Sequence, residues 1–515
     1  MKQIDEKYKA PGVSYLQFIW NVSINRNLLL GCMFASIALF LIFKLFYPYP
    51  DFFGDSYSYI YAAKEHSDIN IWPIGYSKFL SVIHDITPSD NLLVGIQYFG
   101  MQIVLLHFLF TLLYFFPFST WQRNIFYIFI FINPFTLYLC NTVNSDAIFG
   151  IFSVLWIVLL IWVVQRPRLH QIFGSSLLLF ACFTIRNNAY YYPLVGTIAY
   201  LLSQQPLWRK IAGIAMPVLF IVPFILYTRE AAFKMTGTRQ YSLFTGWQLA
   251  NNALYMYDQI EVDSLDLPTK EARDLNQYAL QYIRRVNPSS YRTALEEYVG
   301  NFFIRQPEAP LKQYYGSHYI FKTKNDNIIN WARASAAFEP FGKALILQHP
   351  IAYSNYFVLP NIKHYFIPPL SHIGLYNYGQ NEIDPIAQAW FKYPTNKISC
   401  ASYSFQGDLL LIYIGLFLFV NIYYLWNIVK FTFRNGFGQL RMPFIASHIF
   451  ILTFLILNFL FSITSTVNIL RYQYVPLCVL AAFGLTLGSY LDQLSPKTFF
   501  RKAHHVQHRM QEINT

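Results

Sequence analysis

Ten apolar segments, most of them long enough to cross a lipid bilayer, run through this chain of 515 residues. A helix needs about 20 apolar residues to cross the hydrocarbon core, and only helices and closed barrels satisfy their backbone hydrogen bonds there. Charged residues make up 12% of the chain, about half the usual share for a soluble protein. The sequence therefore predicts an all-α polytopic membrane protein with about ten transmembrane helices. We expect these at residues 28–47, 92–115, 124–140, 145–164, 171–185, 189–203, 210–227, 408–429, 443–463 and 473–491.

The basic residues of the short loops predict the orientation of the chain. One set of loops and tails holds sixteen of them: Lys2, Lys7, Lys9, Arg26, Arg123, Arg166, Arg168, Arg209, Lys210, Lys430, Arg434, Arg441, Lys497, Arg501, Lys502 and Arg509. The opposite short loops hold only four, which are Lys64, Lys78, Arg186 and Arg471. By the positive-inside rule both termini are cytoplasmic. This distribution also accounts for the net charge of +12 without a nucleic-acid partner.

Three parts follow from this topology. Residues 1–227 form an N-terminal membrane module, whose first outer loop spans residues 48–91. Residues 228–407 form a large, mostly helical loop domain on the outer side, in which LPTKEARDLNQYALQYIRRV has the period of an amphipathic helix. Residues 408–515 form a C-terminal three-helix membrane module with a basic cytoplasmic tail.

Ionisable residues gather at the outer ends of the expected spans: Asp51, Asp55, Asp146, Arg186 and Arg471. Ionisable groups at membrane depth are costly and default to a functional interpretation. A transporter more often holds such groups near the midplane, between repeated halves of the chain. The distribution favours a site at the outer membrane surface.

The three carboxylates each have a structural alternative. Asp55, in DFFGDSYSYIYAAKEH, is either a general base at the mouth of a cavity or an N-terminal helix cap. Asp51 is either a second carboxylate of the site or a solvated turn residue. Asp146 either faces the same cavity or, with Ser145, caps the fourth span.

The two arginines and the aromatic residues are also open to two interpretations. Arg186 and Arg471 either bind a phosphate, which suits guanidinium geometry, or reach out to lipid headgroups. The aromatic residues of the first loop either anchor it at the membrane interface or line a sugar site: Tyr57, Tyr59, Trp72 and Tyr76. The outer histidines show no zinc-ligand spacing, so no metal ligand is assigned, although a divalent metal ion stays open as a cofactor.

Several motifs together resemble the GT-C superfamily of integral-membrane glycosyltransferases. They are GDSYSYIYAA with WPIGYSKFL, then NP followed by NSDAIFG, then IRNNAYYYP, and finally NILRYQYVP before the last span. The chain looks most similar to the protein O-mannosyltransferase and aminoarabinose-transferase families. The resemblance covers spans one to seven and the last span, and leaves residues 228–407 unmatched.

The resemblance implies a polyprenyl-phosphate sugar donor and a catalytic acid in the first outer loop. Asp55 matches that acid, although Ser56 stands where many relatives carry a second one. Asp146 matches the acid that opens the fourth span, and Arg186 and Arg471 match basic residues near the donor phosphate. Direct displacement with one base then predicts inversion at the anomeric carbon.

The expected protein is therefore a cell-envelope glycosyltransferase in an inner (plasma) membrane, with its large loop in the periplasm or outside the cell. Its partners are a lipid-linked sugar donor, membrane lipids and an acceptor glycan, lipid or protein. The large loop has no Asn-x-Ser/Thr sequon, which favours a bacterial membrane. Two alternatives stay open: a transporter or flippase, and a polysaccharide polymerase or ligase that uses lipid-diphosphate-linked glycans.

Overall fold

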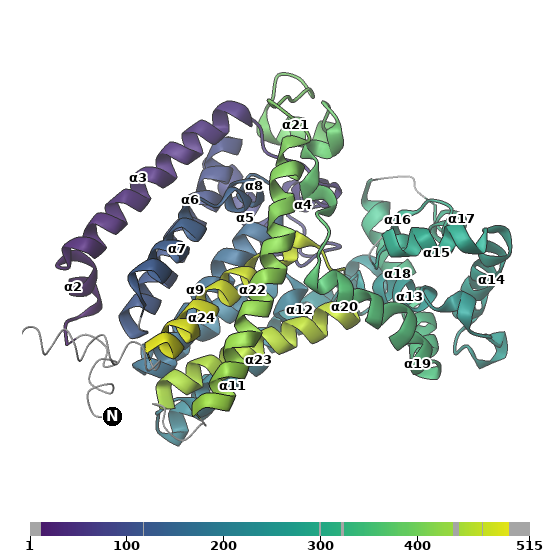
Figure 1. Cartoon of the computed structure of the whole chain (residues 1–515). Helices are drawn as coiled ribbons and strands as arrows, with labels where there is room; N and C mark the ends of the chain where they lie inside the picture. Colours follow the sequence, from purple (N-terminus) through teal and green to yellow (C-terminus); the bar gives the residue numbers. More distant parts are fainter. Residues whose placement is uncertain are drawn as a thin grey trace, which may run out of the picture.

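The computed structural model describes residues 12–116, 118–297, 300–320, 324–435, 442–465 and 467–493. In these ranges every regular element is a helix (Figure 1), and the extended pairings there are the isolated bridges Asp51–Thr142 and Glu382–Lys397. Eight candidate spans are long and apolar enough to cross a membrane. The all-α, polytopic membrane architecture is therefore confirmed. The spans are α3 (Ser23–Phe46), α6 (Asp90–Phe115), α7 (Thr120–Phe131) with α8 (Pro134–Cys140), α9 (Ser145–Gln165), α12 (Leu207–Thr236), α22 (Phe405–Asn435), α23 (Met442–Ser465) and η8 (Leu470–Gln473) with α24 (Tyr474–Gln493).

Two further expected spans are shorter helices. α10 (His170–Ile185) has 16 residues and packs along α9 and α12, and α11 (Tyr192–Leu202) has 11 residues and packs along α23. The turn η1 (Asn187–Tyr191) joins them. Both are shorter than a straight helix needs to cross a bilayer, so their crossing stays a prediction.

The third expected span is broken by proline. α7 ends at Phe131, and Pro134 begins α8 with Asn133 as its N-cap. The Asn133 side chain accepts a hydrogen bond from the Phe135 amide over 3.1 Å. Proline disfavours the helical conformation at the residue before it, and Asn133 is extended at this point, so the helix is interrupted between α7 and α8.

The segment of residues 48–91 forms a helical layer over one end of the bundle. It contains α4 (Gly54–Lys64) and α5 (Gly75–Ile86), which pack on each other, and α21 (Pro385–Phe391) packs on α4. Figure 1 shows these helices beside the C-terminal end of α3. α2 (Tyr15–Trp20) precedes α3 in the chain. It packs against the N-terminal end of α3 and against α6.

The large loop holds a hydrophobic core of its own. Trp247 stacks on Trp331 with ring centres 4.0 Å apart, and buried residues between positions 247 and 357 form the core around this pair. Figure 1 shows these helices as a group beside the long bundle. They are α13 (Thr245–Leu254), α14 (Lys270–Arg285), α15 (Pro288–Glu297), α16 (Phe302–Arg305), α17 (Pro310–His318), α18 (Lys324–Gln348), α19 (Pro350–Tyr353) and η4 (Ser354–Val358). The next helix, α20 (Leu359–Phe366), packs on α22 and α23.

The structure refines the division of the chain. The predicted amphipathic segment is α14, but the expected boundary at residue 227 falls inside α12, which continues through Thr236. Residues of the segment from Tyr365 to Ile398 pack in the same core as the spans rather than with α13–α18. This segment contains the short turns η5 (Ser371–Gly374) and η6 (Tyr376–Gly379) as well as α21.

Candidate functional site

A cavity of about 540 Å³ lies where the bundle meets the large loop. Five of the predicted site residues line it: Asp55, Tyr59, Trp72, Arg186 and Arg471. The opposite wall comes from α13, α16 and α18 of the loop domain. The cavity is therefore lined by residues from the segment 48–91, from spans far apart in the sequence and from the loop domain.

Two guanidinium groups hold one buried carboxylate beside this cavity. Arg471 donates from Nη1 to Asp146 Oδ2 over 2.8 Å, and Arg186 donates from Nη1 to Asp146 Oδ1. The side chains of Asp146 and Arg471 are each only 4% exposed, so the ion pair is buried. Because both oxygens of Asp146 are occupied by cations, this carboxylate is a structural anion between two arginines.

The local sequence places these groups at the same end of the bundle. α9 begins at Ser145, which puts Asp146 in the first turn, where a helix favours negative charge. Ser145 Oγ accepts a hydrogen bond from Arg186 over 3.3 Å and lies 3.0 Å from the hydroxyl of Tyr59. Asn144, and neither Ser145 nor Asp146, is the N-cap residue, and Asp146 is not among the residues that line the cavity, so both alternatives for Asp146 are wrong.

Asp55 is the carboxylate that faces the cavity. It lies in the first turn of α4, is 34% exposed, and has Oδ2 3.7 Å from Nη2 of Arg471. Phe53 is the N-cap, and its amide donates to Ser56 Oγ over 2.9 Å, so the alternative of Asp55 as a cap is wrong. Enclosure by protein raises the pKa of Asp55, and the charges of Arg471 and Arg186 partly offset this effect. A raised pKa makes the carboxylate a better base.

The arginines are buried rather than extended to lipid headgroups. The exposed fraction is 4% for the Arg471 side chain and 12% for Arg186. The ring of Tyr472 contacts both guanidinium groups, with its centre 4.9 Å from Cζ of Arg471 and 4.4 Å from that of Arg186. Nε of Arg471 is buried with no hydrogen-bond partner. The headgroup alternative is therefore wrong for both residues.

Asp51 does not line the cavity. Its carboxylate is buried and accepts hydrogen bonds from the Asn377 amide over 2.8 Å and from the Gln406 side chain over 3.2 Å. Burial raises its pKa to about 7 in spite of these donors. The solvated-turn alternative is therefore wrong. Through these hydrogen bonds Asp51 connects the first loop to η6 and to the start of α22.

Two predicted aromatic residues also lie outside the cavity lining. Tyr57 packs against the ring of Phe52, with ring centres 6.0 Å apart. Tyr76 is fully buried, packs edge-on against Tyr59 and donates to Gln97 Oε1 over 3.0 Å. Its role in the structure is to support Tyr59 from behind.

Most of the uncharged polar residues that line the cavity were not predicted from the sequence. Asn144, Asn187 and Asn188 are sequence neighbours of Asp146 and Arg186, and this proximity was the available signal. The loop domain adds further lining residues that no sequence pattern marked, because their position depends on how α13, α16 and α18 pack: Gln248, Asn252, Asn301, Arg305 and Trp331.

A neutral histidine lies next to the charged residues. His372 packs with its ring centre 6.0 Å from that of Phe53 and 4.6 Å from that of Tyr378. Burial and the positive charges of Arg305 and Arg471 lower its pKa to about 3. The imidazole is therefore uncharged near neutral pH and adds no cation to the site.

Among the described residues, no three His, Cys, Asp or Glu side chains come together as metal ligands. Comparison of the chain with models of protein families, with curated proteins and with solved structures finds no match. The resemblance to the GT-C superfamily therefore stays a prediction that rests on the sequence motifs.

Proposed function

We propose that this protein is a membrane glycosyltransferase that moves a sugar from a polyprenyl-phosphate donor to a hydroxyl group of an acceptor. The observation that carries the proposal is the cavity-facing carboxylate of Asp55, held 3.7 Å from the buried Arg471. This pairs a base with a cation that suits a phosphate, at the end of a membrane-embedded helix bundle.

In the proposed reaction the acceptor hydroxyl attacks the anomeric carbon of the donor sugar. Its proton passes to a carboxylate oxygen of Asp55 as the new glycosidic bond forms. The bond between the anomeric carbon and the phosphate oxygen breaks, and its electron pair leaves with the phosphate. Since attack and departure occur on opposite faces, the anomeric configuration inverts.

Guanidinium groups lie beside the proposed reaction centre. Arg186, Arg305 and Arg471 line the cavity, and Nη2 of Arg471 lies 3.7 Å from Oδ2 of Asp55. A phosphate that gains negative charge as the bond breaks is stabilised by guanidinium groups placed next to it. Phosphate is already a good leaving group, so the proposal assigns no general acid.

The neutral lining suits a sugar. The aromatic rings of Trp72, Phe244 and Trp331 are among the apolar lining residues, and Asn187 and Asn252 provide amide groups. Few, well-placed polar groups on mostly apolar walls are typical of small-molecule sites. We assign the donor and the reacting end of the acceptor to this cavity, and we place it on the outer face of an inner or plasma membrane, with both termini cytoplasmic.

The test uses the purified full-length protein in nanodiscs with radiolabelled sugars on polyprenyl monophosphate and on polyprenyl diphosphate. We expect saturable binding and turnover of a monophosphate donor. Turnover of the diphosphate donors alone would replace the proposal with a polymerase or ligase. Movement of a lipid-linked sugar across proteoliposomes, with no sugar released from its lipid, would replace it with a flippase.

A further inference from the structure

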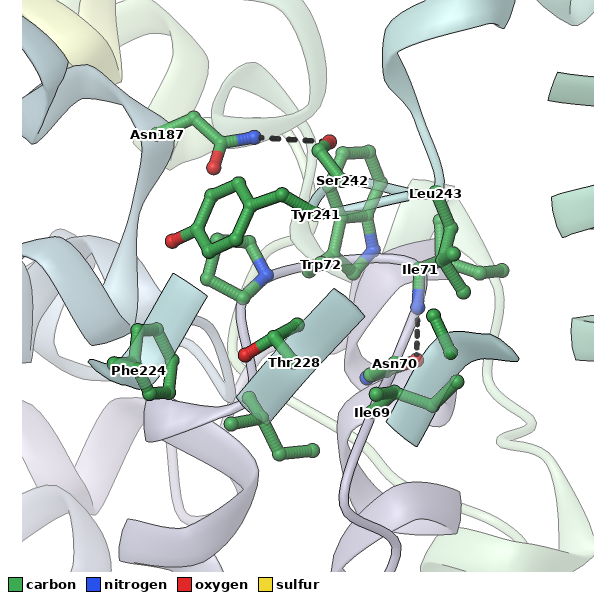
Figure 2. Close-up of a pocket in the computed structure, with 13 residues that line it drawn as sticks. Ile69, Asn70, Ile71, Trp72, Asn187, Phe224, Thr228, Tyr241, Ser242 and Leu243 are labelled. Atoms are coloured by element: carbon green, nitrogen blue, oxygen red, sulfur yellow. Dashed lines mark hydrogen bonds between the residues drawn. The ribbon is translucent and has the colours of Figure 1, made fainter. Parts of the chain in front are cut away.

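A small side pocket adjoins the large cavity and shares a wall with it. The side pocket, of about 20 Å³, has Thr228 and Tyr241 among its lining residues, and shares Trp72, Asn187 and Ser242 with the cavity that holds Asp55. Figure 2 shows Thr228 on α12, Tyr241 in the following loop and Asn187 on the opposite side, with Trp72 nearby. The side pocket therefore borders the candidate reaction cavity, and Trp72 is part of the wall that they share.

Three polar atoms around the side pocket are buried with no hydrogen-bond partner. They are Oδ1 of Asn187, Oγ1 of Thr228 and the hydroxyl oxygen of Tyr241. A buried polar group left unpaired destabilises a protein, so three such groups around one pocket call for an occupant that bonds to them.

The chemistry of these atoms defines the occupant. The amide nitrogen of Asn187 is directed to Ser242 Oγ over 3.4 Å, as the dashed line in Figure 2 marks, so the free Oδ1 needs a donor. Thr228 and Tyr241 can each donate or accept. A carboxylate or phosphate cannot donate, and a methyl group would leave all three atoms unpaired. No Asp, Glu, Lys or Arg is among the side-pocket lining residues, so an ammonium group would have no counter-charge. The chemistry that matches these atoms is a neutral hydroxyl group, which donates one hydrogen bond and accepts two.

The size of the side pocket limits the occupant further. About 20 Å³ holds one water-sized group and excludes a second sugar ring. In a hydroxymethyl group the oxygen is two bonds from the sugar ring, one more than in a ring hydroxyl, so it reaches farther past the wall of the large cavity. We propose that the side pocket binds the exocyclic hydroxymethyl group of the transferred sugar, so that the enzyme selects hexoses over 6-deoxyhexoses. This inference rests on the proposed function.

The test compares binding of two radiolabelled lipids that differ by one oxygen: a hexose and its 6-deoxy analogue, each on polyprenyl monophosphate. Wild type in nanodiscs is measured beside Thr228→Val, Tyr241→Phe and the conservative Thr228→Ser. Thr453→Val is the matched control, because its hydroxyl bonds to the Ile449 carbonyl on an exposed face of α23. Thermal unfolding checks each fold, and we expect no loss for Thr228→Val because its hydroxyl has no partner.

We expect wild type to bind the hexose lipid about 10- to 100-fold more tightly than the 6-deoxy lipid. Thr228→Val and Tyr241→Phe reduce this ratio toward one, while Thr228→Ser and Thr453→Val keep it. Equal binding of the two lipids by wild type overturns the inference alone and leaves a structural water as the occupant. A ratio that persists in both Thr228→Val and Tyr241→Phe also overturns it. Binding of neither lipid overturns the proposed function together with the inference.

Discussion

Nη2 of Arg471 lies 3.7 Å from Oδ2 of Asp55, while Nη1 of the same guanidinium donates to the buried Asp146 over 2.8 Å. One cation thus links the carboxylate that faces the cavity to the carboxylate behind it. Because the Arg471 charge favours the ionised form of Asp55, the two residues set the basicity of the site together.

Removal of the Arg471 charge should change the pH dependence of transfer. The charge of Arg471 lowers the pKa of Asp55 against the larger effect of burial, so Arg471→Gln should raise that pKa. The base is active when ionised, and the acidic limb of kcat/KM should therefore move to higher pH. A pH profile of sugar transfer measures this shift. Lys78→Gln, on the exposed part of the same loop, is the control, and an unmoved acidic limb in Arg471→Gln would contradict the coupling.

Asp146 should be far more important for stability than an exposed carboxylate. Asp146→Asn keeps the shape of the side chain but leaves two buried guanidinium groups without their shared anion. We expect it to lower the free energy of unfolding by about 3–5 kcal/mol, measured by denaturant titration in detergent. Asp68→Asn, which breaks an exposed pair with Lys78, should cost at most about 1 kcal/mol. Equal effects of the two substitutions would argue against the buried cluster.

Burial of the Asp51 carboxyl group predicts that the stability of the protein depends on pH. Burial raises the Asp51 pKa from 3.8 to about 7. Between these values the folded protein holds a proton that the unfolded chain has lost, so this residue's contribution to stability falls as the pH rises from about 4 to about 7 and then levels off. Asp51→Asn removes the titrating group. The melting temperature of wild type relative to this variant should decline between pH 5 and pH 7, and a difference that is constant or rises over that range would refute the assignment.

The cavity wall from the loop domain depends on a close approach of two helices. A Cβ at Gly246 would lie 1.7 Å from the carbonyl oxygen of Ser335, so Gly246→Ala forces α13 away from α18. We expect lower thermal stability and weaker donor binding, because Gln248 and Asn252 of α13 line the cavity. Gly316→Ala in α17 of the same domain meets nothing within 4 Å and serves as the control, with unchanged or slightly higher stability. Tolerance of Gly246→Ala would contradict the observed packing.

The sequence was informative where helix ends determine position. The ends of the spans predicted that Asp55, Asp146, Arg186 and Arg471 share one side of the membrane, and the structure brings these four together. The length of the apolar segments alone predicted the all-α membrane architecture, because in lipid only helices and closed barrels satisfy the backbone hydrogen bonds.

The positions of other residues depended on tertiary contacts that no local pattern reveals. Asp51 is only four residues before Asp55, yet the backbone bridge to Thr142 and the amide of Asn377 hold it away from the cavity. Tyrosine is a residue type typical of membrane interfaces, but the Tyr76 side chain is buried and packs edge-on against Tyr59. Arg305 reaches the cavity only because α16 packs against α13.

The most direct test of the proposed function compares wild type with Asp55→Asn for donor binding and for sugar transfer from the same radiolabelled polyprenyl-phosphate donor. Asp68→Asn is the control, as a carboxylate of the same loop that does not line the cavity. We predict that Asp55→Asn binds the donor within a few-fold of wild type but transfers the sugar about 10²- to 10⁴-fold more slowly, while Asp68→Asn does both normally. Transfer by Asp55→Asn at the wild-type rate would contradict the assignment of Asp55 as the catalytic base.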